Sequence, residues 1–250
     1  MRIVSDVSFL QYGLVALTAF AAATIGGITG YGGGLLLPLV LVPIVGAQAI
    51  VPIIGISALF TNTSRVLAFR SDVDRRLALP IILCSVPTCI LGAYGFTLLT
   101  GPGAALLIGT MLVVLVPARR LLTHLKVRLQ RPGVAAASGV YGVLVGGTTG
   151  AGIVLLSILM MAGLSGRAVI ATDALVSIAV GIVKTASFQA FGALPLDSWI
   201  MALVIGAAGT PGAFVAKRLT ENLSVKVHNA ILEVAIVAGG LILIAQSLRA

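Results

Sequence analysis

The chain has 250 residues, of which 59% are apolar and only 9% are charged, and its mean hydropathy is +1.16. Soluble domains carry roughly 25% charged residues, so this chain has too little charge to cover a surface exposed to water. Several apolar runs reach the roughly 20 residues that a membrane span needs, which predicts an all-α polytopic membrane protein and excludes a soluble one.

The net charge of +9 follows the pattern of a membrane protein rather than that of a nucleic-acid-binding protein. Most of the Lys and Arg residues fall in short connectors between apolar runs, where they determine topology. No segment is long enough to build the basic soluble face that nucleic acid requires. The connector residues are Arg70, Arg75, Arg76, Arg119, Arg120, Lys126, Arg128, Arg131, Arg167, Lys217, Arg218 and Lys226.

The first half of the chain begins with an uncharged stretch, Val7 to Ser64, that contains the sequence GGITGYGGGLLLPLV at 26–40. Each glycine in a helix interior costs up to about 1 kcal/mol relative to alanine. The pattern therefore predicts two short helices, 9–27 and 33–45, separated by a glycine-rich break. Full spans are expected at 49–69, 77–98 and 104–121.

The second half repeats this pattern after the basic linker RRLLTHLKVRLQR at 119–131. A shift of 120 residues places GGITGYGGGLLL (26–37) over GGTTGAGIVLLS (146–157), and Ser57 over Ser177. Helices are expected at 133–147, 152–164, 168–189, 198–217 and 227–248. The predicted organisation is a first repeat (1–121), a cytoplasmic linker (122–132) and a second repeat (133–250).

Charge predicts that the two repeats have opposite orientations in the membrane. The connector 70–76 is basic, but its equivalent 190–197 has no Lys or Arg, and the uncharged connector 100–103 corresponds to the basic 217–226. Each glycine-broken pair must then be re-entrant, which places the basic connectors in the cytoplasm and both termini outside.

Inverted repeats with interrupted helices are typical of transporters, whose substrate site lies at the interruptions. Helices starting at Gly32 to Gly34 and at Gly152 to Val154 would aim unpaired N–H groups and partial positive charge at an anion. The outer pairs Gly26/Gly30 and Gly142/Gly146 also suit close helix packing. The predicted site residues of the two tips are Thr29, Gly30, Gly32, Gly33, Gly34, Thr148, Thr149, Gly150 and Gly152.

Few ionisable residues lie within the predicted spans, where each is costly and points to function. Arg65 and Lys184 would add positive charge to the site, with Asn62 as a polar neighbour, although both cations could instead extend to the membrane surface. Asp173 and Glu233 could carry a coupling proton or pair with a neighbouring cation. No catalytic, metal or cofactor site is expected.

The chain resembles the TauE/SafE family of sulfite and sulfonate exporters over nearly its whole length. The resemblance rests on GITGYGGGLLLPLV and NTSRVLAFRSDVDRRLALPIILCSVP, and on the second copy with TTGAGIVLL, ALPLDSW and GTPGAFVA. It implies a bacterial inner-membrane protein that carries small sulfur-containing anions or related carboxylates. Ile153 and Val154 stand where the first copy has glycines, so one tip could hold the substrate while the other packs.

The sequence thus predicts a secondary anion transporter that works by alternating access between its halves. An anion channel, a carrier of small carboxylates and a structural subunit of a larger complex are the alternatives. The expected partners are a small anion, the lipid bilayer and a coupling proton. The exact substrate, the direction of transport and the oligomeric state are left open.

Overall fold

The computed structural model describes residues 7–29, 33–124, 128–219 and 237–248. These residues form helices and short connections and contain no strand. The helices are α1 (Phe9–Thr29), α2 (Gly33–Val45), α3 (Ala47–Ala68), η2 (Arg70–Asp72), α4 (Arg75–Thr97), α5 (Gly101–His124), α6 (Arg131–Gly147), α7 (Gly152–Met161), α8 (Arg167–Ala190), α9 (Leu196–Leu219) and a C-terminal helix (Val237–Ser247).

The predicted helices are confirmed in number and order over the described residues, with ends that differ by a few residues, except that the predicted start of the last helix at 227 lies outside the described residues. Local sequence signals explain several of the ends. Gly46 takes a positive φ angle of 80° at the end of α2, and Gly163 takes one of 102° directly after the last turn of α7. Asp74 caps α4, because its side chain accepts a hydrogen bond of 3.0 Å from the Leu77 N–H.

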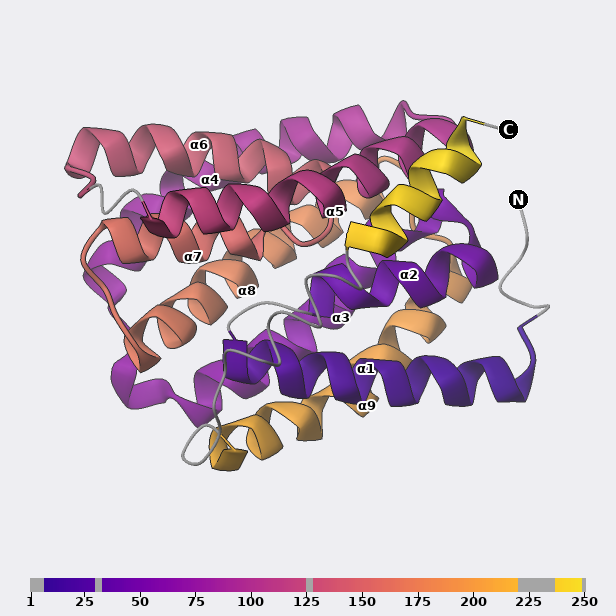
Figure 1. The fold of residues 1–250 in the computed structure, drawn as a ribbon, viewed down its shortest axis with the longest axis horizontal. Coiled ribbons are helices and arrows are strands. Elements are labelled where there is room, and N and C mark those ends of the chain that lie inside the picture. The colour runs from indigo at the N-terminus through magenta and orange to yellow at the C-terminus, as the bar shows by residue number, and fades with distance from the viewer. Residues whose placement is uncertain (1–6, 30–32, 125–127, 220–236, 249–250) are drawn as a thin grey trace.

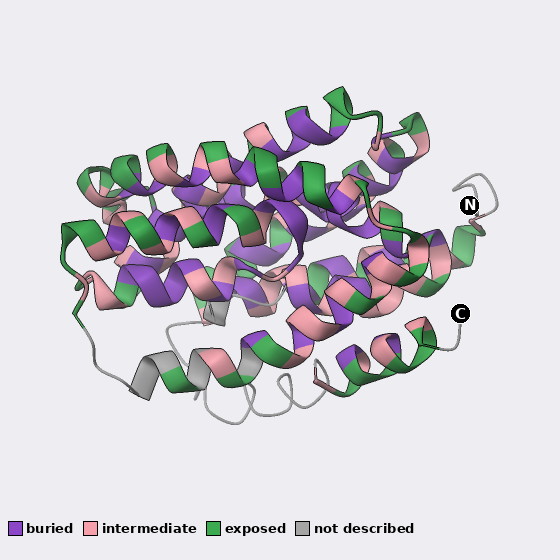
Figure 2. Ribbon diagram, turned by 90° about the horizontal axis from the view of Figure 1, so that it is seen from above, coloured by how far each residue is buried: buried purple, intermediate pink, exposed green. Residues whose placement is uncertain are grey.

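The apolar surface and the candidate membrane spans of the molecule are those of an integral membrane protein. Five helices among the described residues are long and apolar enough to cross a bilayer: α1, α3, α4, α8 and α9. The faces of the helices that point inward are buried, and those on the periphery are exposed (Figure 2). Large apolar side chains such as Leu83, Leu91 and Leu203 are exposed on that periphery, as contact with lipid requires.

One end of the helix bundle, the basic end, carries the connectors rich in Lys and Arg. Three contacts define it: the Leu129 N–H donates to the Met161 carbonyl (2.9 Å), the Asp74 N–H to the Thr172 hydroxyl (3.0 Å), and Lys217 Nζ to the Ala68 carbonyl (2.9 Å). The basic end therefore holds the start of α6 and the end of α7, together with the starts of α4 and α8 and the ends of α3 and α9.

The opposite end, the uncharged end, has no Lys or Arg among its described connectors. There Gln48 Nε2 donates to the Leu99 carbonyl (2.9 Å) and Trp199 Nε1 donates to Gln189 Oε1 (3.1 Å). These contacts place the start of α3 beside the end of α4, and the end of α8 beside the start of α9. It follows that α3 runs toward the basic end whereas α8 runs away from it.

The long helices of the two halves interlock rather than forming separate bundles (Figure 1). Helix α1 packs on α9 and α6 on α4, while α3 and α8 cross at the centre. Gly142 and Gly146 lie against the backbone carbonyls of Ser85 and Cys89 on α4, where any Cβ would collide. The predicted packing role of this glycine pair is therefore confirmed.

Candidate functional site

The two glycine-broken helix pairs meet at a cavity of about 160 Å³ between α3 and α8. At its centre the first turn of α2 touches the start of the second tip, because a Cβ on Gly34 would lie 2.8 Å from the Gly150 nitrogen. Helix α2 has 13 residues and α7 has 10, so they extend about 20 Å and 15 Å from this contact toward opposite ends of the molecule. The meeting point is therefore deep inside the bundle.

The backbone between α6 and α7 forms part of the cavity wall and carries N–H groups without hydrogen bonds. Gly150 has a φ of 80° and the next residue, Ala151, is right-handed, a combination that forms anion-binding concavities. Within the described chain, no hydrogen bond is donated by the backbone N–H groups of Thr149, Gly150, Ala151 and Gly152. All four residues line the cavity.

The unpaired N–H groups lie slightly earlier in the chain than the sequence suggests. Free groups were expected at Gly152 to Val154, but the Ile153 N–H donates to the Gly150 carbonyl (3.3 Å) and the Val154 N–H to the Ala151 carbonyl (2.9 Å). These short turns use the N–H groups of the second and third residues of α7. The N–H groups of Gly152 and of the segment that precedes α7 are left to face the cavity.

Lys184 holds this tip against α8. Its Nζ donates to the Val145 carbonyl (2.7 Å) and to the Thr148 carbonyl (3.0 Å) at the end of α6, and only 4% of the residue is exposed. A cation at a helix C-terminus satisfies orphan carbonyls and the negative end of the helix dipole. A Cβ on Gly55 would lie 3.4 Å from Lys184 Cε, so a small residue on α3 leaves room for the lysine stem.

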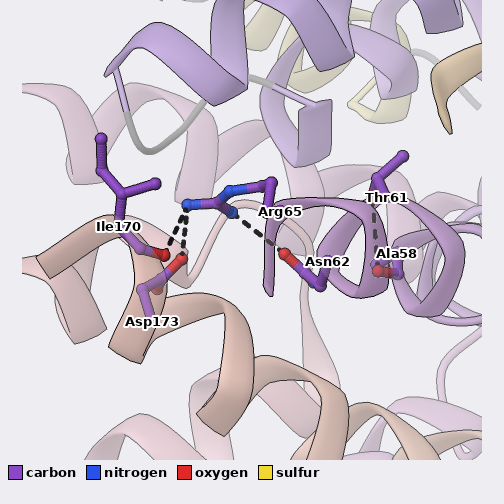
Figure 3. Close-up of polar contacts among 6 residues, drawn as sticks. All are labelled: Ala58, Thr61, Asn62, Arg65, Ile170 and Asp173. Carbon is purple, nitrogen blue, oxygen red and sulfur yellow. Dashed lines mark hydrogen bonds and ion pairs between the residues drawn. The ribbon is translucent and has the colours of Figure 1, made fainter. Parts of the chain in front are cut away.

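Arg65 lies at the other end of the cavity and joins α3 to α8 (Figure 3). Its Nη2 lies 3.0 Å from Asp173 Oδ2 and 3.4 Å from the Ile170 carbonyl, and its Nη1 donates to Asn62 Oδ1 at 3.0 Å. Neither Arg65 nor Lys184 extends to the membrane surface, because the two residues are only 8% and 4% exposed. Asp173 was expected either to carry a coupling proton or to pair with a neighbouring cation, and the structure contains the ion pair with Arg65.

The cavity is elongated along the crossing of α3 and α8. Asp173 and Lys184 lie about 16 Å apart along α8, and Arg65 and Gly55 lie about 15 Å apart along α3. We call the two ends of the cavity the Lys184 pole and the Asp173 pole. The unpaired N–H groups belong to the Lys184 pole, because Lys184 binds the carbonyl of Thr148 directly before them.

The structure brings most of the predicted site residues together. The predicted residues that line the cavity are Gly34, Asn62, Arg65, Thr148, Thr149, Gly150, Gly152, Asp173 and Lys184. Gly33 is the first residue of α2 and Thr29 is the last residue of α1. The side chain of Thr29 is not among those that the structure describes. Gly30, Gly32 and Glu233 lie outside the described residues.

Tyr141, Ser177 and Gly181 also line the cavity but were not singled out from the sequence. Tyr141 is fully buried on α6, directly before the packing glycine Gly142 in the sequence. The match of Ser177 with Ser57 in the internal repeat was a usable signal, since both residues line the cavity. Tyr141 had no such signal, because its equivalent position in the first half is not a tyrosine.

No group of three or more His, Cys, Asp or Glu side chains that could hold a metal ion occurs in the part of the chain that the structure describes. The site instead combines backbone N–H groups, an ammonium, a guanidinium and one carboxylate. The N–H groups and the two cations are groups that bind small oxyanions, whereas the carboxylate of Asp173 is paired with Arg65.

The fold and the site define a polytopic membrane protein with a buried, cation-containing cavity between two glycine-interrupted helix pairs. A family model, described as the sulfite exporter TauE/SafE, matches residues 15–243, and the chain belongs to this family of membrane exporters. Searches of curated proteins and of solved structures gave no match.

Proposed function

We propose that the protein is a secondary transporter that binds a small sulfur-containing anion at the Lys184 pole of the cavity. The observation that carries the proposal is the run of unpaired N–H groups from Thr149 to Gly152 beside a buried ammonium. A buried N–H without a partner costs about 1–3 kcal/mol, which an anion in the cavity would recover. Family membership supports sulfite and sulfonates as the substrate class.

The proposed transport mechanism is alternating access between two inverted repeats. Equivalent helices run in opposite directions, since α3 ends at the basic end and α8 starts there. The packing is also reciprocal: the first helix of each half packs on the fourth helix of the other. In such an arrangement the two repeats can exchange conformations, so that a central site opens first to one side of the membrane and then to the other.

The proposed topology places the basic end in the cytoplasm of the bacterial inner membrane. Every described Lys and Arg outside the cavity lies at or near that end, which is the distribution that the positive-inside rule requires. Both termini would then be outside, as the sequence predicts. Coupling to protons stays a prediction for Asp173 and Glu233, and the ion pair with Arg65 supports a positioning role for Asp173.

Exchange in proteoliposomes tests the proposal. Vesicles preloaded with unlabelled sulfite or ethanesulfonate should accumulate the labelled anion transiently, and the rate should saturate with concentration. A conductive current without exchange would identify an anion channel instead. Exchange of small carboxylates but of no sulfur-containing anion would replace the substrate class.

Ligand binding by the purified protein gives an independent measurement. An anion at 100 times its dissociation constant should stabilise the folded state by about 2.7 kcal/mol. Thermal unfolding with sulfite, sulfonates and chloride would detect this shift. The absence of any shift with sulfur oxyanions and sulfonates would contradict the proposed substrate class.

A further inference from the structure

The cavity ends at the ion pair between Arg65 and Asp173 on the side that faces the basic end of the bundle. The α3 residues that line the cavity stop at Arg65, and the α8 residues begin at Asp173. Phe69 and Thr172 lie beyond the pair toward the basic end; they are only 2% and 0% exposed and do not line the cavity. The guanidinium and the carboxylate therefore form the wall of the cavity on this side (Figure 3).

The same ion pair connects the two halves of the chain. Arg65 on α3 belongs to the first half, and its Nη2 lies 3.0 Å from Asp173 Oδ2 and 3.4 Å from the Ile170 carbonyl on α8, in the second half. Next to the pair, the Asp74 N–H donates to the Thr172 hydroxyl at 3.0 Å. These contacts must break if α3 and α8 move apart at the basic end, because each of them joins one half to the other.

The contacts between α3 and α8 toward the uncharged end are of a different kind. There the apolar stem of Lys184 lies against Gly55, and the Leu59 side chain lies against Gly181 near the crossing of the two helices. Among the described residues, every hydrogen bond and ion pair between α3 and α8 lies toward the basic end. Polar contacts thus hold these two helices together at one end only.

The internal repeat shows that this difference between the two ends is a property of the sequence. The shift of 120 residues that aligns the two halves places Arg65 over Thr185 and Asp173 over Ile53. Thr185 and Ile53 are buried, at 9% and 0% exposure, but their side chains carry no charge and cannot form an ion pair. The charged contact therefore has no counterpart at the equivalent positions.

We infer that the ion pair between Arg65 and Asp173 is a gate between the anion site and the basic end, which is the cytoplasmic side in the proposed topology. The inference rests on the proposed transport of an anion through the cavity. In alternating access one repeat moves against the other around the site, and salt bridges between the moving bodies are exchanged in such transitions. The gate is closed in this structure, and it has to open before the anion reaches the basic end.

A cysteine on the cavity side of the gate reports its opening. Ser177 lines the cavity about one helical turn from Asp173, so the reporter is Ser177→Cys in a background in which Cys84 and Cys89 are replaced by alanine. The small, membrane-impermeant anion 2-sulfonatoethyl methanethiosulfonate is added to inside-out vesicles and, separately, to right-side-out vesicles. Asp173→Asn should raise the labelling rate from the cytoplasmic side about 10- to 100-fold, the factor expected for the loss of one hydrogen bond between charged groups. The rate from the outside should not rise.

Two further variants control for charge and for folding. Asp72→Asn removes the same charge at the basic end, but Asp72 does not line the cavity, so both labelling rates should equal those of the reporter alone. Arg65→Gln combined with Asp173→Asn leaves no unpaired buried charge and replaces the single variant if Asp173→Asn does not fold. The double variant should raise cytoplasmic labelling no further than Asp173→Asn does, because both remove the same contact.

The outcomes separate the gate from the proposed function. An unchanged cytoplasmic labelling rate in Asp173→Asn and in the double variant, or a rise from both sides of the membrane, would overturn the gate and leave anion transport in place. Failure of the protein with native Arg65 and Asp173 to exchange any small anion in proteoliposomes would overturn the proposed function itself.

Discussion

At the scale of single residues, the two glycines of the second tip have different reasons to be glycine. A Cβ on Gly150 would collide with the Leu35 side chain, and its φ of 80° disfavours any other residue. A Cβ on Gly152 would meet no atom within 4 Å, although Gly152 lines the cavity. Gly150 is thus required by the fold, whereas Gly152 leaves open space in the cavity, where the proposed function places the anion.

This difference predicts that Gly152→Ala separates binding from folding. The added methyl group enters the cavity beside the unpaired N–H groups, so the dissociation constant for the substrate anion should rise about ten-fold or more through loss of one charge-assisted hydrogen bond. The melting temperature without ligand should not fall. Titration by thermal shift measures both quantities.

Gly139→Ala is the control for this substitution, because Gly139 lies on α6 away from the cavity with nothing within 4 Å of its added Cβ. It should leave binding unchanged, and its melting temperature should stay the same or rise, because alanine is favoured over glycine in a helix interior. Gly150→Ala should lower the melting temperature and binding together. Normal anion binding by Gly152→Ala would show that the ligand does not approach the backbone there.

At the scale of the elements, Lys184 connects the broken helix pair to α8 by binding two carbonyls at the end of α6. Lys184→Met keeps the apolar stem but leaves both carbonyls buried without a donor. Each unsatisfied group costs about 1–3 kcal/mol, so the variant should melt several degrees lower and should bind anions more weakly. Thermal unfolding with and without ligand tests this expectation, and an unchanged melting temperature would contradict it.

Removal of the N-terminal cap of α4 should lower stability without affecting transport. Asp74→Ala removes the hydrogen bond from the Leu77 N–H and should destabilise the protein by about 1 kcal/mol. Since Asp74 does not line the cavity, the Michaelis constant for exchange should stay the same. Asp72→Ala is the comparison in the same connector, because Asp72 caps no α-helix. A changed Michaelis constant for Asp74→Ala would assign this residue a direct role.

The elements were predictable from the sequence, but the connections among the site residues were only partly so. Apolar runs interrupted by glycines and charges define helix ends, and the internal repeat brought both tips to attention. The ion pair of Arg65 with Asp173 joins residues 108 positions apart, and no local pattern determines it. The turn that satisfies Ile153 and Val154 depends on the left-handed backbone at Gly150, which sequence spacing alone does not specify.

At the scale of the whole molecule, the proposed inverted arrangement of the two repeats predicts that equivalent connectors face opposite sides of the membrane. Gln48, in the first turn of α3, lies at the uncharged end, and Ser165, in the equivalent region between α7 and α8, lies at the basic end. Ser71 and Pro195 form a second equivalent pair, after α3 and after α8. These four residues are exposed and lie outside the cavity, so cysteine substitutions there should not disturb binding.

Cysteine labelling tests this arrangement in a background in which the free cysteines Cys84 and Cys89 are replaced by alanine. A membrane-impermeant maleimide added to intact cells should label Gln48→Cys and Pro195→Cys. Ser71→Cys and Ser165→Cys should react only after the membrane is permeabilised, because the basic connectors stay on the cytoplasmic side. Exchange activity of the cysteine-free background is the control for folding. If both members of either equivalent pair are labelled from the same side, the halves have the same orientation, and transport cannot proceed by exchange of their conformations.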